Sequence, residues 1–395
     1  MGRKVMLDSE KVVMKHTIIA ILLGVSPLLS AQQASGTDAD FAARCKGEGV
    51  VLCQGFDDDS AVAGRWGDWM GVSSGKSNNV EQGYPPRPTI DYQIKASGAG
   101  SIRLDVPPYS SSQPSGNWFT NFSKDRTVRF GENSNFFVQF RQRISEDYLV
   151  SPAHKITIIA EGDLPSCGAP GQGTLTRKSG GGCGESCSPN EIALIAGALG
   201  YPVMYNACSS SPSHGPYDGF EADSTTSFGK HIGRHYYLPN NAMPAPYCYK
   251  RGRHPKYGSP NGESRMLPPT GNCWPIKAGE WITWQIEIKT GPYKDREWHD
   301  SRVRLWAAHE GEPSQLVIDW GPYNLTAASG SGRVTDFGKI WLMTFQTGRK
   351  ITDRYPPMTT WYDELIISTR IIPDPGTGKP PPSAEEVKAA YGGSQ

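Results

Sequence analysis

The sequence has almost no net charge and no apolar run long enough to cross a membrane. Its 40 Lys and Arg residues stand against 39 Asp and Glu residues, which leaves a formal charge of +1. No global field therefore favours nucleic acid, and any preference for an anionic partner must be local. The apolar run Thr17–Val25 is shorter than the roughly 20 residues that a spanning helix needs. We expect a monomer whose partners are neither nucleic acids nor membranes.

The sequence also lacks an internal repeat and the regular alternation of strands and helices that is typical of α/β proteins. It is rich in turn-forming residues, with 45 glycines and 32 prolines, and its apolar residues alternate with polar ones over short segments. These features predict an all-β fold, a two-sheet antiparallel β-jelly roll. Strands are expected at 50–56, 89–96, 101–106, within 128–143, 154–160, 281–289, 302–307, 315–319, 339–345 and 361–368.

The N-terminus is typical of a secretory signal. Lys15 and the apolar run precede Ser30-Ala31, which suits cleavage, so residues 1–31 are predicted to be a signal peptide, with Met14 as an alternative start. We therefore predict a secreted protein, extracellular or periplasmic.

The cysteine content agrees with export. Exported cysteines usually pair, and the sequence has eight of them. Cys45–Cys53 and Cys248–Cys273 are the local pairings that we expect. The remaining cysteines, which would staple an insertion, are Cys167, Cys183, Cys187 and Cys208. The alternative is a zinc site that combines Cys183 and Cys187 with His214, although these spacings match no zinc ribbon.

One domain with a long insertion is predicted. Residues 32–48 are expected to form a linker, 49–372 the jelly roll, and the Pro/Gly-rich residues 373–395 a disordered tail. Residues 161–275 form an irregular insertion in which Glu191–Leu199 is an apolar stretch compatible with a helix. Residues 107–126 are expected to form a loop that carries Trp118. A loop as long as the insertion usually serves function.

Three of the predicted strands carry polar side chains along one face. In Phe137–Arg143, Val138 and Phe140 fall on one face, whereas Gln139, Arg141 and Arg143 fall on the other. The same alternation gives a polar face to the strands at 281–289 and 302–307, with Gln285, Lys289 and Arg304. On a curved sheet, this face would form a groove suited to an anionic polymer.

These segments and their order resemble the concanavalin A-like jelly-roll polysaccharide lyases, which include alginate and glucuronan lyases. The similarity rests on Gly55-Phe56-Asp57, the strand Gln139-Phe-Arg141-Gln-Arg143, the segment Lys289-Thr-Gly-Pro-Tyr293 and the closing strand Trp361–Ser368. In that family the tyrosine of a Lys-Ala-Gly-x-Tyr segment is catalytic, so the resemblance implies a catalytic Tyr293. The family's Gln-Ile-His triplet is missing; His154 lies in the nearest equivalent segment, with Lys155 as its alternative.

The resemblance implies β-elimination from a uronate-containing polysaccharide. Loss of the C5 proton requires that the neighbouring carboxylate be neutralised, which Arg141 and Gln139 would do. Tyr293 would transfer protons, with His154 or Lys155 as the alternative base. This chemistry requires no cofactor and no catalytic metal. The residues expected to bind the polymer are Arg143, Lys289, Gln285, Arg304 and Trp118.

Each candidate also has a purely structural explanation. Arg141 and Arg143 would pair with acidic residues on the sheet surface, Tyr293 would pack in a turn, and His154 would cap the start of a strand. Asp57-Asp-Asp59 would suit a structural calcium ion, or would form a solvated acidic turn.

Two other functions fit the same fold. A glycoside hydrolase acting on a β-glucan-type polysaccharide needs two carboxylates about 5–9 Å apart. The Glu-x-Asp-x-x-Glu strand of jelly-roll glucanases is missing, so Glu221-Ala-Asp223 or Asp363-Glu364 would have to replace it. A non-catalytic lectin-like protein would stack sugar rings on tryptophans in predicted loops, which are Trp66, Trp69, Trp118, Trp274 and Trp298.

Overall fold

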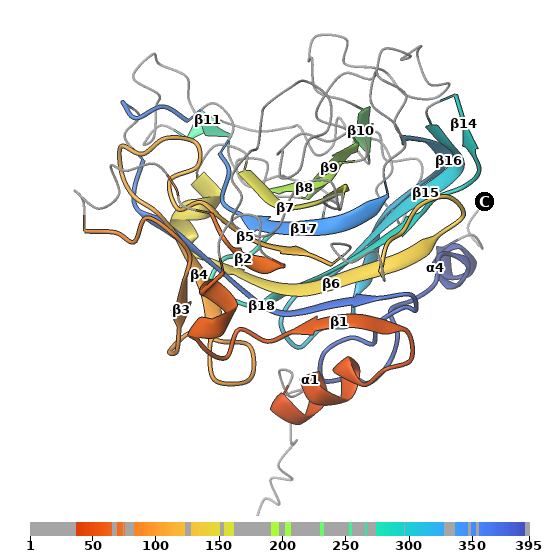
Figure 1. The fold of residues 1–395 in the computed structure, drawn as a ribbon, viewed down its shortest axis with the longest axis horizontal. Coiled ribbons are helices and arrows are strands. Elements are labelled where there is room, and N and C mark those ends of the chain that lie inside the picture. The colour runs from red at the N-terminus through yellow and green to blue at the C-terminus, as the bar shows by residue number, and fades with distance from the viewer. Residues whose placement is uncertain are drawn as a thin grey trace, which may run out of the picture. The chain divides into compact units, whose positions relative to one another are not determined.

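Two antiparallel sheets form the fold (Figure 1), which confirms the predicted two-sheet β-sandwich of jelly-roll type. The computed structural model describes residues 37–64, 69–73, 75, 83–122, 128–150, 154–161, 191–196, 202–206, 230–232, 253–254, 265–266, 274–295, 297–327, 336–346, 349–352 and 355–391. The predicted signal peptide and most of the insertion lie outside these ranges. The helices within them are too short or too polar to span a membrane.

The first sheet has the order β14-β15-β13-β6-β18-β4-β3, with β1 also paired to β18 and β16 to β15. Its strands are β1 (Val50–Gln54), β3 (Thr89–Asp91), β4 (Ser101–Val106), β6 (Asn135–Ile144), β13 (Ile282–Lys289), β14 (Tyr293–Lys294), β15 (Glu297–Ala308), β16 (Gln315–Thr326) and β18 (Met358–Ser368).

The second sheet has the order β10-β9-β8-β7-β17-β5-β2. Its strands are β2 (Met70–Val72), β5 (Asn117–Asn121), β7 (His154–Glu161), β8 (Ile192–Ala196), β9 (Val203–Asn206), β10 (Lys230–Ile232) and β17 (Phe337–Met343). A separate pair is formed by β11 (Arg253–His254) and β12 (Arg265–Met266).

The core lies between the two sheets. Val138 and Phe140 of β6 and Trp284 of β13 pack from the first sheet, and Ile340 and Leu342 of β17 pack from the second. These residues alternate along each strand with residues of the outer faces, as a sandwich requires. Fully burying one such aliphatic or aromatic side chain contributes about 1.5–3 kcal/mol.

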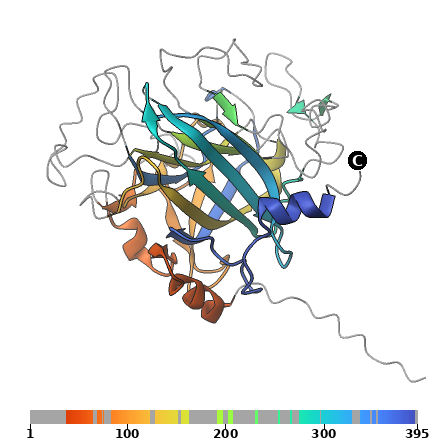
Figure 2. The same ribbon diagram turned by 90° about the vertical axis from the view of Figure 1, so that its right-hand side faces the viewer.

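The two α-helices of the described residues lie on the outer face of the first sheet, away from the core. α1 (Asp38–Cys45) and α4 (Ala384–Tyr391) contribute Phe41 and Ala384 to a small apolar cluster with Phe137, Trp306 and Ile366. Figure 2 shows α1 in red and α4 in blue at the periphery of the strands. The described residues also form two short 3₁₀ helices, η1 (Asp59–Val62) and η2 (Glu146–Val150).

The structure corrects both predicted termini. The expected linker contains α1, which begins after Thr37, whose side chain accepts a hydrogen bond from the Asp40 N–H, an N-cap followed by acidic residues in the first turn. The expected disordered tail is ordered through α4, and the Trp306 indole donates to the Pro382 carbonyl at 2.8 Å. Turn-rich composition predicted disorder here, but the apolar patch on the sheet gives these segments a surface to cover.

Two internal predictions were also wrong. The segment at 192–196 forms strand β8 rather than a helix, because five apolar residues are enough for a buried strand and too few for a helix. Asn117–Asn121 forms β5 within the expected loop, and Trp118 points into the core. The flanking serines and prolines had concealed the alternation in this strand.

Candidate functional site

The predicted polar face of the first sheet exists. β13 lies between β6 and β15, and its register places Gln285 opposite Gln139 and Glu287 opposite Arg304. Residues directly opposite each other in antiparallel strands share a face. The residues that share this face, as expected, are Gln139, Arg141, Gln285, Lys289 and Arg304.

The centre of this face is covered by the C-terminal segment. The Gln285 side chain binds the backbone of Ile372 in both directions, accepting from its N–H at 2.8 Å and donating to its carbonyl at 3.1 Å. Gln139 Nε2 donates to the Pro373 carbonyl at 3.1 Å. Both glutamines are fully buried. They hold the end of the chain in place and do not face a groove.

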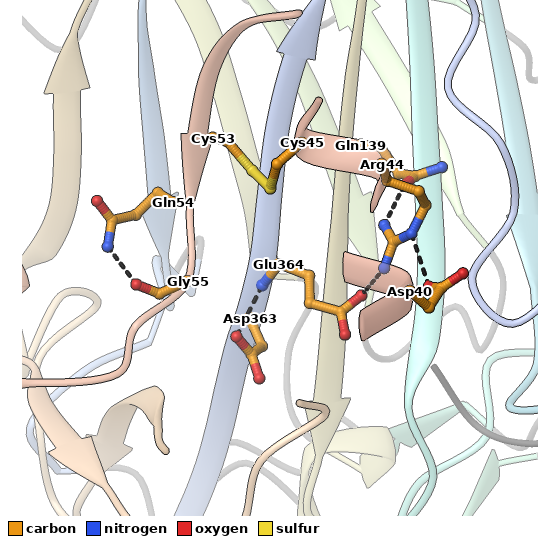
Figure 3. The surroundings of a disulfide bond; sticks show 9 residues. All are labelled: Asp40, Arg44, Cys45, Cys53, Gln54, Gly55, Gln139, Asp363 and Glu364. Carbon is orange, nitrogen blue, oxygen red and sulfur yellow. Dashed lines mark hydrogen bonds and ion pairs between the residues drawn. A yellow bond between two sulfur atoms is a disulfide. The ribbon is translucent and has the colours of Figure 1, made fainter. Parts of the chain in front are cut away.

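Helix α1 closes the same face beside this segment (Figure 3). Arg44 donates from Nη1 to Gln139 Oε1 at 2.7 Å and from Nε to Asp40 Oδ2 at 2.9 Å, and its Nη2 pairs with Glu364. The predicted Cys45–Cys53 disulfide joins the end of α1 to β1. The other six cysteines and His214 lie outside the described residues.

Arg141 is buried in this cluster of charges. Its Nη1 lies 3.7 Å from Glu364 Oε1, its Nη2 lies 3.7 Å from Glu310 Oε1, and its guanidinium stacks over Trp281. The side chains of Arg141 and Glu364 are 2% and 0% exposed. Arg141 Nε and Nη1 and Glu364 Oε1 have no hydrogen-bond partner among the described residues. The structural explanation, an arginine paired with acidic residues, therefore describes Arg141 in this structure.

A β-bulge places both acidic residues of β18 in the cluster. The register with β6 shifts between Asp363 and Ile366, and Glu364 has a φ of 52°. Asp363 accepts hydrogen bonds from the N–H groups of Ala96 and Ser97. Burial, together with repulsion from Glu364, raises the pKa of Asp363 to about 7. Both carboxyl groups lie beneath other segments, so they do not flank an open groove as a hydrolase pair would.

The remaining first-sheet candidates lie apart from this cluster. Arg304 pairs with Glu287 at 2.9 Å and with Asp319 at 3.1 Å, and Lys289 is exposed at the end of β13. Arg143 is partly buried opposite Trp361. Tyr293 in β14 lies opposite Trp298 and packs against the core, and its N–H donates to Glu132 at 2.8 Å. The described contacts do not join Tyr293 to Arg141.

His154 and Trp118 are core residues. His154 lies between the sheets with its ring edge-on to Tyr148 at 4.4 Å. Burial lowers the pKa of His154 to about 3, so its ring is neutral at physiological pH. The Trp118 indole donates to the Ala61 carbonyl at 2.9 Å and packs edge-on against Phe56. Trp274 and Trp298 are also buried, whereas Trp69 is 40% exposed; Trp66 lies outside the described residues.

The outer face of the second sheet has a different composition. Trp341 on β17 lies opposite Phe119 of β5 and Ile158 of β7, and these three side chains form an apolar cluster separate from the main core. We define the second-sheet face by its polar and aromatic members, which are Asn117, Phe119, Asn121, Lys155, Glu191, Lys339, Trp341 and Phe345. A face that served packing alone would not need two lysines, a glutamate and two asparagines.

A second β-bulge places Lys155 on this face. The register between β7 and β8 shifts between Lys155 and Thr157, so that Ile156 and Thr157 both point towards the core. Lys155 therefore shares a face with Ile158, although strict alternation would separate them. Its Nζ lies 3.6 Å from Glu191 Oε1 and 5.2 Å from the centroid of the Phe345 ring.

Lys339 occupies the other end of the face. Its Nζ lies 5.3 Å from the centroid of the Trp341 ring, and the residue is 2% exposed. Asn121 lies opposite it on β5, and the Asn121 N–H donates to the carbonyl of the exposed Trp69 at 2.7 Å. Residues 339 and 345 are six positions apart, which corresponds to about 20 Å along an extended strand. The face thus carries an ammonium group near each end of an aromatic strip.

The sequence carries part of the signal for this face. The segment Lys339-Ile-Trp341-Leu-Met343-Thr-Phe345 alternates with a period of two, and its odd-numbered positions form the face. That alternation predicted a strand at 339–345, but it could not show which sheet the strand joins.

The described residues contain no group of three or more His, Cys, Asp or Glu that could hold a metal ion. In the acidic turn, Asp57 accepts from the Ala99 N–H, Asp58 accepts from the Ser60 N–H, and Asp59 accepts from the Tyr92 hydroxyl. These contacts order the loop, and the calcium expectation stays a prediction.

Comparisons with known proteins return structural similarity only. The sequence matches no family model and no curated protein. The PL-14 alginate lyase from Aplysia kurodai is 11% identical with a TM-score of 0.42, over 72% of this chain and 87% of that chain. The alginate lyase Aly36B is 11% identical with a TM-score of 0.35, over 79% and 97%. The botulinum neurotoxin serotype C1 binding domain is 9% identical with a TM-score of 0.32, over 82% and 48%. At these values the similarity carries no inference about activity.

Proposed function

We propose that the chain is a secreted polysaccharide lyase that binds an acidic, uronate-containing polysaccharide on the second-sheet face and cleaves it by β-elimination. The observation that carries the proposal is the pairing of two lysines with aromatic rings on one sheet face. Ammonium groups near both ends of a strip of about 20 Å suit a polymer that repeats its carboxylates better than a single small anion. Aromatic rings between them suit the apolar faces of sugar rings.

We assign a separate role in the reaction to each of four residues of this face. Lys339 and Asn121 bind a uronate carboxylate, and at the reacting sugar this neutralisation favours loss of the C5 proton. Glu191 accepts that proton, and Lys155 beside it donates a proton to the leaving glycosidic oxygen. The C5–H and C4–O bonds break, a C4–C5 double bond forms, and no external reactant is needed. A polymer reaches these nearly buried side chains only in a conformation that exposes them.

Single variants on uronate polymers test this assignment, with the ultraviolet absorbance of the unsaturated product as the readout. Lys155→Met should lower turnover by roughly 10²–10⁴-fold, the usual worth of a positioned acid or base. The matched control is Lys289→Met, which removes an exposed lysine of the other sheet and should leave turnover unchanged. If Tyr293→Phe loses turnover and Lys155→Met does not, the reaction uses Tyr293 and this site is wrong.

The products decide between the three function classes. Unsaturated ends support the lyase. New reducing ends without that absorbance would identify a hydrolase, and binding without either product would identify a lectin-like protein.

A further inference from the structure

Tyr109 stands where a glycine is usual. Pro108 and Tyr109 are the central residues of the turn that follows β4, and Tyr109 has a φ of 51°. Proline at the second position and a positive φ at the third are typical of a type II turn, in which glycine or asparagine avoids the strain. The turn itself therefore does not explain an aromatic residue.

The strained turn is held from below by a buried arginine. Arg349 donates from Nη2 to the Pro107 carbonyl at 2.7 Å and from Nε to the Ser110 carbonyl at 3.2 Å, so it binds both ends of the turn. The Ser110 hydroxyl also donates to the Pro107 carbonyl at 2.7 Å. Above this clamp, Tyr109 is 46% exposed. Backbone strain that its surroundings maintain is found at functional sites more often than elsewhere.

The clamp connects the turn to one end of the second-sheet face. Arg349 Nη1 donates to Gln346 Oε1 at 2.7 Å, and the Gln346 N–H donates to the Ser112 carbonyl at 2.7 Å. Gln346 directly follows Phe345 and forms a β-bridge with His154, the neighbour of Lys155. These contacts connect Tyr109 to the Lys155 end of the second-sheet face. The exposed Trp69 instead adjoins Asn121 at the Lys339 end of that face.

We propose that Tyr109 is a sugar-binding residue, which stacks on a pyranose ring of the acidic polysaccharide beyond the Lys155 end of the second-sheet face. This inference rests on the proposed function, because it takes the polymer to lie along that face. A residue whose backbone is already held in place by Arg349 has less conformational freedom to lose on binding.

Affinity electrophoresis in gels containing a uronate polymer, with steady-state kinetics on the same polymer, tests the proposal. Tyr109→Ala should weaken retardation and raise KM by roughly three- to tenfold, the usual range for one aromatic contact, with kcat unchanged. Tyr109→Phe should behave as wild type. Tyr109→Gly should weaken binding as Tyr109→Ala does, because glycine removes the ring and adopts the positive φ of this turn without strain. The matched control is Tyr92→Ala, since Tyr92 is 47% exposed beside β3 of the first sheet.

The outcomes separate this inference from the function on which it rests. Unchanged retardation of both Tyr109→Ala and Tyr109→Gly, or an equal loss in Tyr92→Ala, overturns the role of Tyr109. Retardation of the wild type without elimination overturns the lyase alone, and Tyr109 is then judged by retardation. A wild-type protein that no uronate polymer retards overturns both.

Discussion

Replacement of Glu364 by glutamine should destabilise the protein strongly without changing its chemistry. Glu364 is fully buried, pairs with Arg44, and lies 3.7 Å from Arg141. Gln has the same shape and the same tolerance for the φ of 52° at this bulge, so Glu364→Gln removes only the charge. Two buried guanidinium groups would then lose the carboxylate that they share.

The size of the loss in stability follows from the contacts that Arg44 and Arg141 keep in the Glu364→Gln variant. Arg44 keeps Asp40 at 2.9 Å and Gln139 at 2.7 Å, but Arg141 keeps only Glu310 at 3.7 Å among its described ion pairs. Removing one partner of a buried ion pair typically costs about 3–5 kcal/mol. For the roughly 230 residues that the structure describes, the unfolding entropy is about 0.5 kcal/mol/K, so Tm should fall by about 6–10 °C.

Urea unfolding and thermal unfolding measure the loss, with Glu310→Gln as the control. Glu310 is a third exposed and contacts Arg141 at the same distance of 3.7 Å, so its neutralisation should cost about 1 kcal/mol at most. The double variant Arg141→Met/Glu364→Gln should be less destabilised than the sum of its single variants. A loss below about 1 kcal/mol for Glu364→Gln would show that the cluster does not depend on this charge. A loss of turnover in the folded variant would return Glu364 to the list of catalytic carboxylates.

Two further predictions concern the same covered face. The pKa of Asp363 is raised to about 7 in the folded state, so between about pH 4 and 7 the folded protein binds a proton that the unfolded chain has lost. The contribution of Asp363 to the free energy of unfolding should therefore be fully present below about pH 4. It should fall by roughly 1.4 kcal/mol per pH unit as the pH rises from about 4 to 7. Asp363→Asn should remove this slope from urea unfolding measured across that range, and an unchanged slope would assign it to other groups. Replacing both Cys45 and Cys53 by serine opens a loop with a sequence separation of 8 and should cost about 2–3 kcal/mol. We also expect proteolysis of this variant to be faster at α1 alone. An unfolding midpoint in urea equal to that of the wild type would contradict the prediction.

The period-two patterns predicted most strands of the first sheet and the shared face of their polar residues. They placed Gln139, Arg141 and Gln285 together, and the register confirms it. They could not show that this face is covered, because the covering C-terminal segment carries few apolar residues and many prolines and glycines. Only the fold shows that Ile372 supplies a backbone N–H and carbonyl that match the Gln285 side chain.

Local distortions explain the other failures at the site. Alternation assumes that each residue reverses the direction of the last, and one extra residue in a strand inverts the pattern from there on. The bulge in β7 brings Lys155 to the face of Ile158, and the bulge in β18 brings Glu364 to the face of Asp363. No periodic reading of the sequence contains either shift, because neither position carries a glycine or proline to mark it.

The two bulges lie in two different clusters of charges among the described residues. Around Glu364, the arginines face carboxylates under α1, and Gln139 and Gln285 bind the chain itself, so the protein's own segments cover this set. Around Lys155 and Lys339, the described contacts place each ammonium group beside an aromatic ring, and Lys155 also pairs with Glu191. The arginine-bearing strand that first indicated an anionic polymer therefore indicates stability, and the case for such a polymer rests on the lysines of the opposite sheet.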